Sequence, residues 1–141
     1  MAVKFFSEDI SHNFKNKKQA ITWIHDSIGE EKQLPGDINI IFTSDKYLLE
    51  INKQYLKHNY FTDIVTFNYC ENEVINGDIF ISIETVKNNS VRFDVNFTTE
   101  LKRVIIHGVL HLIGYNDQND EEKAVMREKE NYYLERLKNL S

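Results

Sequence analysis

Hydrophobic residues along this chain occur at two kinds of spacing, and each predicts a type of secondary structure. In segment 17–28, alanine and isoleucine recur every three or four residues, which is typical of a helix that buries one face. Segment 37–43 is short and rich in isoleucine, which favours a strand. On these criteria the expected strands are 3–6, 37–43, 63–69 and 77–83, and the expected helices are 17–28, 44–56, 84–93, one that opens at 98–100 and a last one that ends near 140.

Short polar signals indicate where several of these elements begin. Pro35 and Gly36 predict a turn into the second strand. Ser44 is suited to cap the helix that follows it, and the run 119–122 has the pattern of a capping box for the last helix. The order of elements predicts an α/β (α+β) fold, with a mixed sheet of about four strands packed with about five helices. Since no segment has the composition of a linker, we expect a single domain over residues 1–141.

Composition narrows the class of protein. The net charge is −5, which argues against coating nucleic acid by bulk electrostatics but leaves room for a local basic face. Cys70 is the only cysteine, so the chain has no internal disulfide partner. No apolar run resembles a secretory leader or is long enough to cross a membrane. We therefore expect a cytoplasmic protein that makes no membrane contact.

Segment 104–117 concentrates residues that can bind a metal ion. His107 and His111 are four residues apart, so on a helix both imidazoles lie on one face, one turn apart. Gly114 can adopt the left-handed conformation that ends a helix, and the reversal can bring Asp117 back over the histidines. Two nitrogens and one carboxylate leave a fourth position open for water, as in catalytic zinc sites. We expect one Zn2+ ion per chain.

Two alternatives stay open for this cluster. Asp120 competes with Asp117 as the third ligand, and both carboxylates are also suited to turn and cap chemistry before the last helix. The two histidines could also be incidental residues of a partly buried helix, but the added glycine and aspartate favour a metal site.

The spacing from His107 to Asp117 matches that of the metzincin metalloproteases, with one large difference. Those proteases carry glutamate directly after the first histidine, where it acts as general base for the zinc-bound water. Gly108 occupies that position here. The sequence therefore predicts a zincin-like metal helix without the peptidase base.

Several motifs together resemble the YbeY family, the metal-dependent endoribonucleases of bacterial ribosomal RNA maturation. The similar blocks are 107–115 (His-Gly-Val-Leu-His-Leu-Ile-Gly-Tyr), 52–55, 62–67, the Gly-Asp-Ile strand at 77–82, and Glu-Leu at 100–101. This resemblance implies a single-strand-specific endoribonuclease that acts in 3′-end maturation of small-subunit ribosomal RNA and in ribosome quality control. The implied partners are ribosomal RNA and the small ribosomal subunit.

Two positions depart from the family pattern. The family has histidine where Asp117 stands, and aspartate is a harder, charged ligand that is expected to alter metal preference. The family also has an arginine of the cleft where Leu56 stands, and leucine cannot contact phosphate. Lys57 and Arg103 are candidate replacements. Arg103 lies four residues before His107 on the same helix face and could reach a phosphate, although it is equally suited to be a surface charge.

Two further residues lie close to these motifs. Asp63 can orient water or substrate, or can simply begin its strand. Tyr115 follows the ligand helix and can contact a ligand or pack, and we expect packing.

Two other functions compete with RNA cleavage. The first is a metallohydrolase of another substrate class, such as a peptidase that has relocated its base, which Gly108 disfavours. The second is a non-enzymatic, ribosome-associated factor whose metal is structural. That role would need a fourth strong protein ligand, for which Cys70 is the one soft candidate.

Overall fold

The computed structural model describes residues 2–56 and 62–139, and it confirms the expected order of elements. The predicted end of the last helix near residue 140 lies outside the described residues. The strands are β1 (Val3–Ser7), β2 (Leu34–Thr43), β3 (Ile64–Asn68) and β4 (Val74–Ser82). The helices are α1 (Lys17–Glu30), α2 (Asp45–Leu56), α3 (Ile83–Arg92), α4 (Phe97–Ile113) and α5 (Asp120–Lys138).

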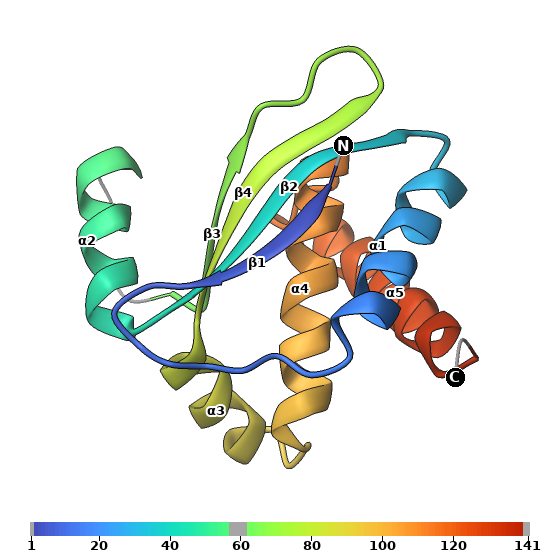
Figure 1. Cartoon of the computed structure of the whole chain (residues 1–141). Coiled ribbons are helices and arrows are strands. Elements are labelled where there is room, and N and C mark those ends of the chain that lie inside the picture. Colours follow the sequence, from blue (N-terminus) through green and yellow to red (C-terminus); the bar gives the residue numbers. More distant parts are fainter. Residues whose placement is uncertain (1, 57–61, 140–141) are drawn as a thin grey trace.

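The four strands form the mixed sheet that the element order predicts, and the strand order within it is β1-β2-β4-β3. β1, β2 and β4 run parallel, and β3 pairs antiparallel with β4. Parallel neighbours need crossover connections, which α1 and α2 provide. Figure 1 shows α1, α4 and α5 on one side of the sheet and α2 on the other, so α4 packs on β3 and β4 and also on α5.

Helix α4 is largely buried, and this packing positions the candidate metal residues. Val104, Ile105 and Val109 of α4 belong to the same hydrophobic core as Ile79 of β4. A side chain on Gly108 would meet Ile79 Cγ2 at 2.9 Å, so this glycine allows the helix to approach the sheet closely. The two histidines lie on a neighbouring side of α4, which this packing leaves partly exposed.

Asparagine side chains cap the last two helices, and the details differ slightly from the predicted signals. The side-chain oxygen of Asn96 accepts from the Thr99 N–H, so α4 begins one residue earlier than expected. Asn119 accepts from the Glu122 N–H at 2.8 Å, as the capping box predicts. The Glu122 carboxylate accepts from the Gln118 N–H instead of that of Asn119, so the reciprocal bond is shifted by one residue.

The turn predicted at Pro35 and Gly36 is wrong, because both residues lie within β2, and Pro35 pairs with Ile75 of β4. β1 pairs with β2 only from Ile38 onward, and the register of β2 against β4 shifts between Pro35 and Ile38. Proline has no N–H to donate and is tolerated at such an unpaired, irregular end of a strand. Pro35 and Gly36 therefore lie at a shift of register in β2 and do not end the strand.

Candidate metal centre

Helix α4 presents His107 and His111 on one side, as their spacing predicts. Their Nε2 atoms lie 3.0 Å apart, and the ring planes are inclined at 85°. Both rings are partly exposed, whereas most of their neighbours on α4 are buried. A rigid, packed helix therefore holds two imidazoles at an accessible surface.

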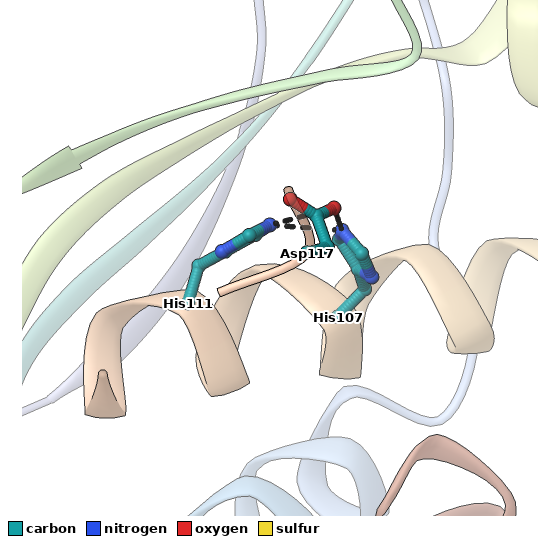
Figure 2. A group of neighbouring side chains, drawn as sticks. All are labelled: His107, His111 and Asp117. Atoms are coloured by element: carbon teal, nitrogen blue, oxygen red, sulfur yellow. Dashed lines mark hydrogen bonds and ion pairs between the residues drawn. The ribbon is translucent and has the colours of Figure 1, made fainter. Parts of the chain in front are cut away.

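Gly114 ends α4 and reverses the chain. Its φ of 126° is a backbone conformation that L side chains rarely adopt, and its N–H donates to the carbonyl oxygens of Leu110 and His111. The reversal brings Asp117 back over the helix, where its Oδ2 lies 3.3 Å from His107 Nε2 and 3.4 Å from His111 Nε2. Figure 2 shows the carboxylate facing both rings.

The three polar atoms form a nearly equilateral triangle with edges of 3.0, 3.3 and 3.4 Å. In a tetrahedral zinc site with bonds of about 2.0–2.1 Å, neighbouring ligand atoms lie about 3.3 Å apart. The donor types and the spacing both fit, so the group of His107, His111 and Asp117 could hold a metal ion.

Hydrogen bonds behind each ring determine which nitrogen faces Asp117. His111 Nδ1 lies 2.9 Å from the carbonyl oxygen of Tyr115, which only accepts, so Nδ1 must donate. His107 Nδ1 lies 2.6 Å from Glu130 Oε2 and donates in the same way. In the neutral rings both Nε2 atoms then carry lone pairs. Three acceptors converge on one point, which is unfavourable unless a cation lies among them.

A proton can serve as the cation among these acceptors. The two histidines differ in how readily they bind one. Burial lowers the pKa of His107, but the hydrogen bond and charge of Glu130 outweigh it and raise this pKa on balance. Burial and the neighbouring charge of His107 lower the pKa of His111. His107 is therefore the histidine that binds a proton more readily, and metal binding competes with that proton.

Glu130, on helix α5, is a site residue that sequence reasoning missed. Its side chain is only 7% exposed, and its Oε1 accepts from Arg103 Nη1 at 2.9 Å while its Oε2 faces His107. Burial raises the pKa of Glu130, but hydrogen bonds from His107 and Arg103 outweigh this effect and lower it. One signal could have found it: Glu130 occupies an inward position between the buried Met126 and Tyr133.

Tyr115 packs against the core, as expected, and also anchors the turn that carries Asp117. Its hydroxyl donates to Glu31 at 2.5 Å. Glu31 also accepts from Lys129 at 3.0 Å and from the Tyr133 hydroxyl. The turn after α4 is thus tied to the end of α1 and to α5, by contacts that no local motif indicates.

Asp63 lies half-buried just before β3, within electrostatic reach of the metal group. Burial raises its pKa, the charge of His107 lowers it, and the carboxylates of Glu130 and Asp117 raise it further, for a raised pKa on balance. Beside His111 is a hollow of about 310 Å³. Its lining includes Asn52, Leu56, Thr62, Ile64 and Thr66.

The remaining sequence candidates lie elsewhere or have other partners. Within residues 2–56 and 62–139, the group able to share an ion includes neither Asp120 nor Cys70. The Cys70 thiol instead faces backbone carbonyl oxygens, among them that of Leu112. Arg103 bonds to Glu130 and Asn131. Lys57 lies outside the described residues.

Comparisons with known proteins show which family the chain is similar to. The family model described as Endoribonuclease YbeY matches residues 3–138. Relatives named Endoribonuclease YbeY include that of Parabacteroides distasonis, 45% identical over 95% of this chain and 94% of that protein. The one from Flavobacterium psychrophilum is 46% identical and covers 92% of each chain. A solution structure of a Thermotoga maritima protein matches with a TM-score of 0.67 at 28% identity, over 96% of this chain and 88% of that one. The chain therefore belongs to the YbeY family.

Proposed function

We propose that this chain is a metal-dependent endoribonuclease that cleaves single-stranded RNA in the 3′-end maturation of small-subunit ribosomal RNA and in ribosome quality control. The observation that carries the proposal is the convergence of three acceptor atoms, from His107, His111 and Asp117, in a chain whose relatives are named endoribonucleases. The function is therefore a hydrolysis of RNA at this centre.

The form of the site favours catalysis over a structural metal. Structural zinc sites are closed by four protein ligands, whereas catalytic ones keep a position open. Among the described residues, the metal group has three members. Their side chains are 22%, 24% and 39% exposed, so an RNA strand can reach them from solvent.

Hydrolysis of a phosphodiester forms a bond from a water oxygen to phosphorus and breaks the bond from phosphorus to the leaving ribose oxygen. One water proton passes to a base, and the leaving oxygen gains a proton. A bound divalent ion supplies Lewis acidity to this reaction. Asp63 is our candidate to orient the water and accept its proton, because burial holds its pKa above the usual carboxylate range.

The hollow beside His111 is our candidate for the place where the RNA lies. The two threonines of its lining offer hydroxyl groups, and Leu56 adds apolar surface. Leu56 stands where the family has an arginine, so a phosphate contact has to come from another residue. Arg103 remains a candidate site residue. Its guanidinium is bonded to Glu130 and Asn131, however, so it is placed to hold Glu130 and not to bind a phosphate.

We propose Zn2+ as the ion, one per chain, because imidazole and carboxylate donors in this geometry suit zinc. The proposed partners are ribosomal RNA and the small ribosomal subunit, and the proposed location is the cytoplasm. None of the helices in the described part of the chain is long and apolar enough to cross a membrane. With a net charge of −5, the chain has to contact RNA through local groups.

A peptidase is disfavoured by sterics as well as by sequence. The missing general base would have to stand at Gly108. A Cβ there would meet Ile64 Cδ1 at 2.8 Å and Ile79 Cγ2 at 2.9 Å, so a side chain at this position points into the sheet. A glutamate at position 108 would therefore displace the side chains of Ile64 and Ile79 from their contact with α4.

Cleavage of a labelled single-stranded precursor segment of small-subunit rRNA tests the proposal. The chain is stripped with a chelator and then reloaded with zinc, and a duplex of the same sequence is run beside it. We expect cleavage of the single strand that chelator abolishes, zinc restores and Asp117→Ala removes. Asp120→Ala is the matched control and should cleave normally. Cleavage that persists after chelation, or an inactive chain with full zinc occupancy, would contradict the proposal.

A further inference from the structure

We infer that Glu130 and Arg103 are positioning residues for the metal centre: Glu130 locks His107 with Nε2 turned toward the ion, and Arg103 holds Glu130 in place. This inference rests on the proposed metal site and deepens it. Neither residue touches the ion or the RNA in this role. Both would act through His107.

A continuous chain of hydrogen bonds from Arg103 through Glu130 to His107, referred to as the relay, supports this role. Arg103 and His107 are one turn apart on α4, and Glu130 reaches both of them from α5. Oε2 of Glu130 lies 2.6 Å from His107 Nδ1, and Oε1 lies 2.9 Å from Arg103 Nη1. Each carboxylate oxygen therefore has its own donor, and the carboxylate cannot rotate without breaking a bond.

The arrangement suits a metal ligand in particular. A carboxylate behind a ligating histidine fixes the tautomer, sets the ring orientation and makes the other nitrogen a stronger donor. With its side chain only 7% exposed, Glu130 acts in a weakly screened environment. A buried carboxylate needs a nearby positive charge to stay ionised, and Arg103 supplies such a charge to Glu130.

The second histidine lacks this arrangement and serves as an internal comparison. His111 Nδ1 donates to the neutral carbonyl oxygen of Tyr115 at 2.9 Å. The two ligands thus sit on one helix, four residues apart, with a charged acceptor behind one and a neutral acceptor behind the other. A change at Glu130 should alter His107 and leave His111 nearly unchanged.

The test uses Glu130→Gln, which keeps an acceptor oxygen but removes the charge. Its control is Glu135→Gln, an exposed carboxylate on the same helix that pairs only with Lys138 among the ion pairs seen. Zinc affinity is measured by competition with a chromophoric chelator. The ring nitrogens of both histidines are followed by 15N NMR, with and without zinc.

We expect Glu130→Gln to weaken zinc binding about 10- to 100-fold, the usual effect of losing such a partner. The Nδ1–H signal of His107 should shift or exchange rapidly, while that of His111 stays in place. Glu135→Gln should match the wild type in both measurements. Unchanged zinc affinity in folded Glu130→Gln, or equal changes at both histidines, would overturn the inference.

Variants at Arg103 provide a second test of the inference if Glu130→Gln fails to fold. Arg103→Gln should weaken zinc binding by a smaller factor, and Arg103→Lys should recover only part of the loss, because lysine keeps the charge but not the planar fork. Zinc affinity unaffected by Arg103→Gln would overturn the role of Arg103.

These readouts do not depend on RNA cleavage. A chain that binds zinc through the relay but cleaves no RNA would contradict the proposed function and support the relay. A chain that cleaves RNA with zinc, but binds zinc equally well without the Glu130 charge, would contradict the relay alone.

Discussion

His107 and Asp117 face the same point, but the molecule holds them in different ways. His107 stands on a buried helix and is backed by the charged side chain of Glu130. Asp117 stands on a turn, is 39% exposed, and is located through the anchoring of Tyr115 to Glu31. The helix half of the site is rigid, and the turn half depends on a few polar bonds.

The largest effect should follow a change in the helix half. His111→Ala removes one of the two imidazole donors of the proposed metal site. Four-ligand zinc sites have binding free energies of about 10–16 kcal/mol, so one ligand contributes about 3–4 kcal/mol, or about 100- to 1,000-fold in affinity. Calorimetric zinc titration checks this loss, and circular dichroism should show an intact fold because the ring is partly exposed. Zinc binding at wild-type strength would show that the metal is held elsewhere.

The turn half should respond strongly to loss of a ligand and weakly to exchange of one. Asp117→Ala should weaken zinc binding about 100-fold, since it removes the anionic donor. Asp117→His offers imidazole in its place and should come within about 10-fold of wild type, if the turn adapts. The same competition assay measures both variants. If Asp120→Ala proved as harmful as Asp117→Ala, the third ligand would be wrongly assigned.

The turn anchor should matter more for stability than for metal affinity. Glu31→Gln weakens charge-assisted hydrogen bonds from Tyr115, Tyr133 and Lys129, which should lower the free energy of unfolding by about 1–3 kcal/mol at neutral pH. Zinc affinity should fall less than about 10-fold. Urea unfolding and zinc titration test the two effects. Glu128→Gln, an exposed change on α5, should alter neither quantity.

Acid should remove the stability that Glu31 provides. Burial raises the pKa of Glu31, but its three hydrogen-bond donors outweigh this effect and hold the pKa below the ordinary value. A carboxyl whose pKa is lower in the folded state stabilises the fold above its unfolded pKa, and this contribution is lost as pH falls through the folded pKa. Wild type and Glu31→Gln should therefore converge in stability at acid pH. A constant difference between them across the acid range would rule out this account.

The smallest effect on the metal should come from the sheet side of α4. Gly108→Ala overpacks the contact with Ile64 and Ile79 by about 1–3 kcal/mol, while alanine gains about 1 kcal/mol in helix propensity. A net loss of about 1 kcal/mol in unfolding free energy is expected, with zinc affinity unchanged. Gly29→Ala in α1 meets nothing within 4 Å and should be neutral or stabilising. Equal effects of the two changes would contradict the close approach of α4 to the sheet.

The same two halves differ in how far the sequence could predict them. His107, His111, Gly114 and Asp117 fall within eleven consecutive residues, so helix periodicity and glycine conformation suffice to bring them together. Glu130 lies 23 residues beyond His107, and its contact depends on how α5 packs against α4. Periodicity predicts which face of a helix turns inward, but not which helix it meets.

The strands show the same limit. Isoleucine-rich segments predicted the sheet, since burial on both faces selects such residues. Pro35 was misleading because a missing N–H ends a strand only where a neighbouring strand needs that donor, and β1 pairs with β2 only from Ile38 onward. Whether a donor is needed at position 35 depends on the register of the sheet, which the local sequence does not contain.

Zinc K-edge X-ray absorption on the zinc-loaded chain tests the central claim most directly, since it reports the atoms bound to the ion. The account predicts one zinc per chain, with two imidazole nitrogens and otherwise oxygen donors at about 2.0–2.1 Å. A sulfur donor at about 2.3 Å, which could come only from Cys70 or a methionine, would contradict it, and so would a spectrum with fewer than two imidazoles.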